Sequence, residues 1–533
     1  MARAESRSAV HIDPCILICP SGPQLMIVRT THLTAWTMVF GLLASQPTFA
    51  AELALPGLKL TEPQIPAEVE GATRKLNEQM GRNVEPAQNA AVHLVQLFGA
   101  EVLKDELRDT TLQMLGIESF DKDAPRMIYL EPFSRMKHRE NPEKRQAFLE
   151  QLETDFHMTA GDPWKSEDFP ALAAYFDANQ QQLDRLVAIA DLPHYYAPIL
   201  SAENPPSLMG ASFSLEYRLP YMSHCLAKRA MRSLATGDFD SAANDLMAAH
   251  KLANLLANGS PLDVSLAKAH WADSFAFRSE QSMLRSGLLS ADQAKQYLAR
   301  LQEMPRLPSD TRAADIGERL TMHREIEMLR DSDEALFAFF DWDPMEHQAD
   351  LAKLRGANID WKLAFERTNA MQDKVVVVLG MTDPKAQLEE IRRLDAEATE
   401  WQKVTDADKT SLYDSLMANR EAASRWIGEA VAMGCRANLW QRVHTDNRGS
   451  VRRDFTLVGF ALVAYRQEHG SYPKQLSELT PNLLKELPVD PHSNELWGYK
   501  HLPNGKVRLI SWGANMVPNV GDWRDDDVSL ELD

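Results

Sequence analysis

The sequence predicts a mainly α-helical protein that ends in a small α+β module. From residue 67 to about residue 450, apolar residues recur every three or four positions, and strong helix formers such as Ala, Leu, Glu and Lys dominate. After about residue 490 the spacing shortens toward two, which is typical of strands. The length of 533 residues suffices for two or three domains. We therefore expect a large domain of helical hairpins, followed by a helix on a three-stranded antiparallel sheet.

Residues 226–256 show the clearest local pattern in the helical part. They predict a helix, a tight turn centred on Gly237 and a second helix. Gly237, Phe239 and Ala242 resemble one hairpin of the tetratricopeptide type, in which small residues let two helices approach closely. A similar turn at Gly287 follows fifty positions later, whereas that repeat has a period of about 34. We therefore predict stacked helical hairpins and not a regular repeat array.

Two other segments of the helical part carry informative signals. Ser290 precedes a helical pattern and is a residue type that caps helices by accepting a backbone N–H bond. The run at residues 375–379 consists of four β-branched valines and a leucine, which favours a strand. Because this run lies within a longer helical pattern, we assign it to a helix.

The N-terminal region carries an export signal at residues 26–50. Arg29 supplies a positive charge, residues 33–44 form an apolar run, and small residues precede a cleavage site after Ala50. The run is too short to cross a membrane, which takes about 20 apolar residues. We therefore predict export to the periplasm or cell envelope, with no stable membrane span after cleavage.

The sequence predicts four segments along the chain. Residues 1–50 form an N-terminal extension and signal peptide, in which translation is predicted to start at Met26 because the segment before it lacks the signal pattern. A Pro-punctuated linker at residues 51–66 follows. The helical domain then covers residues 67–450, and the α+β module covers residues 451–533.

The charge balance excludes one class of function. The formal net charge is −19, and no basic patch with interleaved aromatic residues is present in the sequence. A negative field repels the phosphates of nucleic acids and anionic lipid. The sequence therefore predicts no nucleic-acid partner.

The C-terminal module begins with a predicted helix at residues 452–469. Its apolar residues share one face, and Gly470 follows as a residue that accepts the positive φ of a helix end. Three candidate strands lie at residues 496–501, 506–511 and 528–532, with a hairpin turn at Asn504-Gly505.

The order of short motifs in this module resembles the globular domain of type II secretion major pseudopilins. In that family a helix ends in Tyr-Arg…Gly-x-Tyr-Pro, and a Leu-Pro-x-Asp-Pro turn and a Ser-x-Gly-Ala-Asp loop follow. The residues that carry the resemblance are Tyr465, Arg466, Gly470, Tyr472, Pro473, Leu487, Pro488, Asp490, Pro491, Ser511, Gly513, Ala514 and Asn515.

The resemblance covers about the last eighty residues, and the whole chain resembles uncharacterised exported helical proteins with such a tail. Pseudopilins begin with a long hydrophobic helix, and here some four hundred residues of polar helices stand before the module. The resemblance therefore implies the fold of the module and not its assembly into a fibre.

The resemblance also implies a calcium site. The positions that match the family's side-chain ligands are Asn515, Asp525 and Asp527. Calcium prefers six to eight oxygen ligands, and Asn515 replaces the usual Asp, so one negative charge is lost while an oxygen is kept. The alternative interpretation is an acidic surface loop without a metal.

Outside the module, the sequence offers few candidates for chemistry. His323 and Glu327 lie four residues apart on a predicted helix, where they could share a metal or exchange a proton. Glu346 and His347 could add ligands, but nothing in the sequence brings them near. The favoured interpretation is a hydrogen-bonded pair beside the core.

The cysteines of the predicted mature chain are Cys225 and Cys435, which could form a disulfide after export or serve as small buried residues. His224 precedes Cys225, but neighbours on a helix point about 100° apart, so the two are poorly placed as a nucleophile–base pair. The sequence contains no G-x-S-x-G, no H-E-x-x-H, no phosphate-binding Gly loop and no C-x-x-C motif.

Three functions are consistent with these features. The first is an exported, non-catalytic binding or scaffold protein with envelope proteins as partners. The second is an accessory protein of a type II secretion or pilus-like system. The third is a hydrolase-type enzyme with its site in the helical domain. Since no catalytic residue stands out, the sequence favours a function other than catalysis.

Overall fold

The computed structural model describes residues 66–121, 124–159, 161–202, 208, 211–340, 342–407, 419–435, 438–513 and 529–533. The predicted signal peptide lies outside these residues, as does almost all of the linker. Within the described part, no helix has the length and apolar character needed to cross a membrane.

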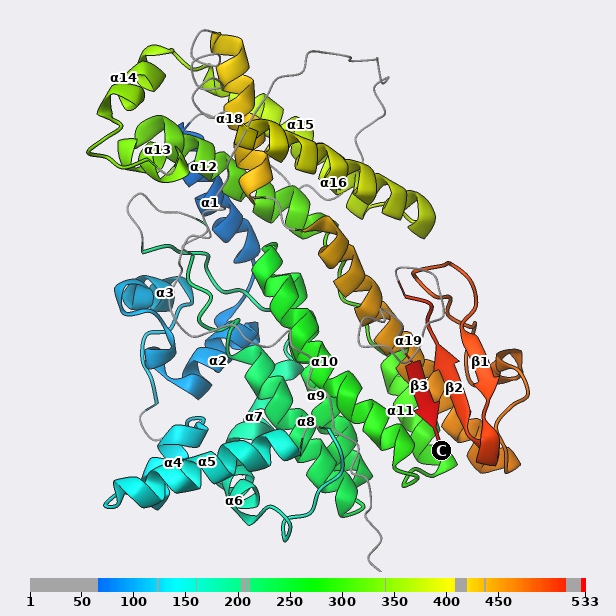
Figure 1. Ribbon diagram of the computed structural model, residues 1–533. Coiled ribbons are helices and arrows are strands. Elements are labelled where there is room, and N and C mark those ends of the chain that lie inside the picture. Colours follow the sequence, from blue (N-terminus) through cyan, green and yellow to red (C-terminus); the bar gives the residue numbers. More distant parts are fainter. Residues whose placement is uncertain are drawn as a thin grey trace, which may run out of the picture.

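The predicted fold class is confirmed: the described chain is mainly helical, with a small sheet near its C-terminus (Figure 1). The first helices are α1 (Pro66–Met80), α2 (Ala90–Phe98), α3 (Arg108–Met114), α4 (Leu130–Lys137), α5 (Pro142–Met158), α6 (Pro170–Ala178), α7 (Gln180–Ala190), α8 (Leu219–Ala235), α9 (Phe239–Gly259), α10 (Asp263–Arg285) and α11 (Ala291–Glu303). A π-helical segment (Ala313–Glu318) precedes α12 (Arg319–Asp331), α13 (Asp333–Phe340), α14 (Gln348–Gly356), α15 (Trp361–Leu379), α16 (Pro384–Ala407), α18 (Arg420–Cys435) and α19 (Leu439–His469). The strands are β1 (Gly498–His501), β2 (Val507–Ile510) and β3 (Ser529–Leu532).

The predicted hairpin around Gly237 is formed by α8 and α9. Gly237 has a φ of +84°, and the side chain of Asp238 caps α9 by accepting the backbone N–H of Ser241. Helix α10 packs on both helices, so these three form the centre of the molecule (Figure 1). The turn at Gly287 joins α10 to α11, and Ser290 caps α11 in a capping box, as predicted.

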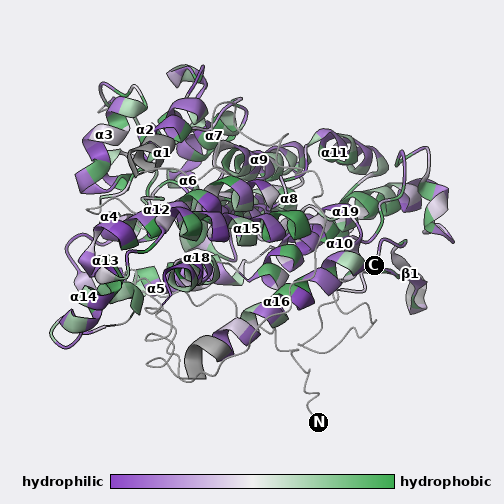
Figure 2. Ribbon diagram, turned by 90° about the horizontal axis from the view of Figure 1, so that it is seen from above, coloured by the Kyte–Doolittle hydropathy of each residue, from purple (hydrophilic) through white to green (hydrophobic). Residues whose placement is uncertain are grey.

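Burial explains why the helices hold together. Around single helices, hydrophilic and hydrophobic residues lie next to one another, as expected for amphipathic helices (Figure 2). The largest hydrophobic core joins α2 and α4 to α11 with α19 and strands β2 and β3. A second core joins α12, α13, α14, α15 and α18. The valine run lies within α15, so its assignment to a helix is correct.

The C-terminal module contains the predicted helix on an antiparallel sheet of order β1-β2-β3. Its helix is the last part of α19, which runs unbroken across the expected domain boundary at residue 451 and ends at Gly470 with a φ of +78°. Gly459 lets the sheet come close, because a Cβ atom there would lie 3.1 Å from the side chain of Leu530 and 2.6 Å from that of Leu284. The module therefore packs on α10 as well as on its own helix.

Candidate functional site

The predicted calcium ligands Asn515, Asp525 and Asp527 lie outside the described residues. The calcium site therefore stays a prediction. In the part of the chain that the structure describes, no group of three or more His, Cys, Asp or Glu side chains is arranged to hold a metal ion.

The predicted pair on α12 is buried, and each member has its own partner. The Nε2 atom of His323 lies 2.8 Å from Oδ1 of Asn369, and Glu327 accepts a bond of 3.0 Å from Arg324. Burial lowers the pKa of His323 to about 4 and raises that of Glu327 to about 7. His347 stacks on Trp342 instead of joining the pair. The favoured interpretation is therefore right in placing both side chains beside the core and wrong in bonding them to each other, because each is bonded to a different residue.

The two described cysteines are free thiols. Burial raises the pKa of both Cys225 and Cys435 to about 12, so neither is a thiolate at neutral pH. The ring of His224 stacks on Phe275 at 4.1 Å and meets Phe156 edge-on at 4.9 Å. These residues therefore serve packing.

The structure reveals a buried polar cluster that the sequence analysis missed. His250 on α9 lies between two carboxylates of α10: its Nδ1 is 2.6 Å from Asp273 and its Nε2 is 2.9 Å from Glu280. Tyr297 on α11 donates a further bond of 2.6 Å to Glu280. Burial opposes the charged imidazole, but the carboxylates outweigh it and raise the pKa of His250 to about 10. This side chain is therefore an imidazolium that ties three helices together.

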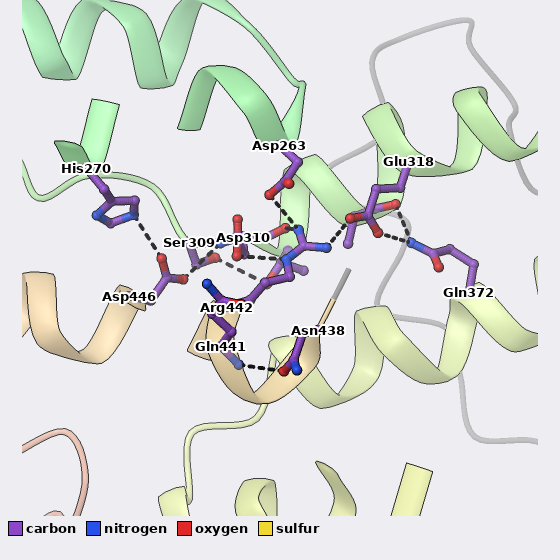
Figure 3. A network of polar contacts seen from close by, with 12 residues as sticks. Asp263, His270, Ser309, Asp310, Glu318, Gln372, Asn438, Gln441, Arg442 and Asp446 are labelled. Carbon is purple, nitrogen blue, oxygen red and sulfur yellow. Dashed lines mark hydrogen bonds and ion pairs between the residues drawn. The ribbon is translucent and has the colours of Figure 1, made fainter. Parts of the chain in front are cut away.

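A second cluster surrounds Arg442 of α19 (Figure 3). Its guanidinium lies 2.9 Å from Asp310, forms an ion pair with Glu318 and lies 3.5 Å from Asp263. Glu318 also accepts a bond of 2.9 Å from Gln372 on α15. Burial raises the pKa of Asp310 and of Glu318, and the charge of Arg442 offsets part of that rise. Glu318 stands in the π-helical segment, a feature often found at functional sites.

His270 of α10 connects this cluster to an open space. Its Nε2 atom forms an ion pair of 2.9 Å with Asp446 of α19, and the backbone N–H of Asp310 donates to the same carboxylate over 3.2 Å (Figure 3). Burial opposes protonation of the ring, but Asp446 outweighs it and raises the pKa of His270.

The space is a cavity of about 290 Å³, which we call the polar cleft. Its walls come from α9, α10, α19, the segment after α11, the junction of α15 with α16, and the turn that holds Pro491 and Asn494 in the C-terminal module. Its charged and amide lining includes Asn254, His270, Asp273, Arg306, Asp446 and Arg453. The polar cleft is the strongest candidate for a functional site, because polar groups from distant segments converge on an accessible cavity.

One signal in the sequence could have pointed to part of this arrangement. His270, Asp273 and Glu280 have helical spacing and share the face of α10 that also carries apolar residues. Polar residues on a buried face need partners. The identity of those partners, on α9 and α19, depends on the tertiary fold.

In comparisons with known proteins, no protein-family description, no curated protein and no solved structure matches this chain.

Proposed function

We propose that the chain is an exported, non-catalytic binding protein of the cell envelope and that the polar cleft holds a small ligand. The observation that carries the proposal is the cavity of about 290 Å³ whose ionisable side chains are fixed by ion pairs and hydrogen bonds. Fixed polar groups favour binding because little side-chain freedom is lost when a ligand enters. Export and the envelope location rest on the signal pattern of residues 26–50.

A hydrolase-type enzyme is the second candidate, because His270 lines the polar cleft beside Asp446. Such an enzyme needs a nucleophile within hydrogen-bond reach of a neutral histidine. The raised pKa of His270 favours the imidazolium form. Among the described residues, no hydroxyl or thiol group is bonded to this ring. These features favour binding over catalysis.

A role as an accessory of a type II secretion or pilus-like system is the third candidate. It is supported by the resemblance of the C-terminal module and by the packing of its sheet against α19. Crosslinking in intact cells followed by purification of the full chain tests it. Enrichment of secretion components would favour this role over that of a separate binding protein.

The binding proposal is tested with a thermal-shift panel of metabolites below about 20 non-hydrogen atoms. The test variant is Gly449→Leu, because a Cβ atom at Gly449 would lie 3.1 Å from Nδ1 of His270 and a longer side chain would fill the cleft. The matched control is Gly434→Leu, which lies on exposed helical surface with open space around its Cβ position.

We expect at least one compound to raise the melting temperature of the wild type and the Gly434→Leu control but not of Gly449→Leu. Mass spectrometry after long incubation should recover that compound unchanged. Consumption of the compound would favour the enzyme. Binding in the cleft would be refuted if the compounds raised the melting temperatures of all three proteins equally, or of none of them.

A further inference from the structure

Two arginines and a histidine of the polar cleft offer nitrogen donors. Nε2 of His270 forms an ion pair of 2.9 Å with Asp446 but has no hydrogen bond within the described structure, and the other ring nitrogen, Nδ1, points away from Asp446 (Figure 3). The guanidinium of Arg453 donates only to backbone carbonyls, those of residues 301, 304 and 305, and its Nε atom has no partner in the described structure. Arg306 is half-exposed, and one of its guanidinium nitrogens forms an ion pair of 2.5 Å with Asp454. Such a set suits a carboxylate, which accepts several charged donors at once.

The same cleft offers acceptors. Oδ1 of Asn254 is buried and has no partner within the described residues. Asp273 accepts a bond from His250 at its Oδ1 atom, while its Oδ2 atom has no hydrogen bond to the described chain. An ammonium group carries three donors and no acceptor, so it matches these two acceptors.

Both kinds of group line one small cavity, and each leaves hydrogen-bonding capacity unused. On this basis we infer that the polar cleft binds a small zwitterion, a molecule with a carboxylate and an ammonium group such as an amino acid or a dipeptide. The carboxylate meets Arg306, Arg453 and His270, and the ammonium group meets Asn254 and Asp273. This inference rests on the proposed binding function and names the ligand class of the same site.

A zwitterion is favoured over a molecule with only one of its charges, because the lining of the cleft carries both donors and acceptors. A lone carboxylate would leave the acceptors without a donor, and a lone ammonium group would leave the guanidinium groups without an acceptor. Unpaired buried polar groups weaken binding. We therefore expect a zwitterion to bind at least about tenfold more tightly than a molecule that carries only one of its charges.

Isothermal titration calorimetry on the full mature chain tests this expectation. The probes are L-alanine and L-alanyl-L-alanine as zwitterions, propionate and inorganic phosphate as anions, and ethylammonium as a cation. At least one zwitterion should bind, with a dissociation constant at least about tenfold below those of the single-charge probes.

Two matched variants locate the binding. Asn254→Leu removes the unpaired acceptor and should weaken binding of the zwitterion by about tenfold. Asn258→Leu, one helical turn further along α9, changes an exposed residue outside the cleft lining and should leave the affinity unchanged. Thermal unfolding of both variants checks that they fold.

The outcomes separate this inference from the proposed function. If propionate or phosphate binds as tightly as the zwitterions, or if the zwitterions bind Asn254→Leu unchanged, the ligand class is wrong. If neither zwitterion binds but the thermal-shift panel finds another compound that Gly449→Leu excludes, the inference fails while the binding function stands. If no compound binds in either experiment, both fail.

Discussion

Replacement of Arg442 by Met tests how α19 is held to the π-helical segment and to the residues just before it. Arg442, Asp310 and Glu318 are each more than nine-tenths buried, and they come from α19, the segment before the π-helix and the π-helix itself. The substitution Arg442→Met removes the only cation that directly contacts both carboxylates within the described residues. Methionine keeps much of the side-chain length, so the change is chiefly one of charge.

The expected cost is about 4 kcal/mol of unfolding free energy. Removal of one partner from a buried ion pair costs about 3–5 kcal/mol, because a charge is left without compensation. Asp263 is 40% exposed and lies 3.5 Å from the guanidinium, so its share is about 0–1 kcal/mol. Gln372 still donates to Glu318 in the variant, which limits the loss. In the variant background, Glu318→Gln should restore about 1–2 kcal/mol by removing one of the stranded charges.

The destabilisation caused by Arg442→Met should decrease as the pH is lowered. Burial raises the pKa of Asp310 and Glu318, and without Arg442 these values rise further. A carboxyl group with a raised pKa in the folded state keeps its proton to a higher pH than in the unfolded chain, so stability falls as pH rises through that pKa. The deficit of Arg442→Met relative to the wild type should therefore be smaller at pH 5 than at pH 8.

Urea unfolding followed by circular dichroism at several pH values measures these quantities. Arg393→Met is the matched control, since Arg393 pairs with Glu390 and Glu397 on the exposed surface of α16, where the expected cost is about 0–1 kcal/mol. A loss in Arg442→Met no larger than in the control, or a deficit that grows toward acid pH, would refute the reasoning.

Four further predictions use the same assays. Lys228→Met should stabilise the protein, most strongly below pH 7 and hardly at pH 10.5, because burial lowers the pKa of Lys228 to about 7 and penalises its charged form. His250→Gln should be less stable than the wild type, because the charged imidazole is lost. The difference in unfolding free energy should be largest below pH 6.5 and should vanish as pH rises toward 10. Asp490→Ala should lose about 1–3 kcal/mol, since the buried carboxylate accepts two backbone N–H bonds of 2.9 Å. The melting temperature of the wild type should be higher in calcium than in chelator, whereas that of an Asp525→Asn, Asp527→Asn double variant should be the same in both. Equal melting temperatures of the wild type in calcium and in chelator would contradict a calcium site.

Local patterns account for the parts of the fold that the sequence predicts well. Gly237 and Gly470 mark helix ends because their positive φ angles suit glycine, and Ser290 caps α11 because its hydroxyl binds the first turn. These signals depend only on residues that are close together in the sequence. The valine run in α15 shows that the longer helical pattern outweighs the β propensity of four side chains.

The buried ion pairs could not be predicted in the same way, because they join residues far apart in the chain. His250 and Glu280 are 30 positions apart, and Arg442 and Asp310 are 132 positions apart. A charged residue in a helical pattern is usually on the surface. Only the packing of α10 between α9 and α19 shows that Asp273 and Glu280 face inward.

The C-terminal module contributes to the candidate site as well as to the fold. The carboxylate of Asp490 binds the backbone N–H groups of His492 and Trp512, which fixes the turn that places Pro491 and Asn494 at the wall of the polar cleft. Other parts of the wall come from α9 and α10 of the helical part. A ligand in this cleft would touch both parts at once, so its binding free energy would add to the stability of their contact. The turn that Asp490 fixes therefore has a structural role within the described chain, since it forms one wall of the polar cleft.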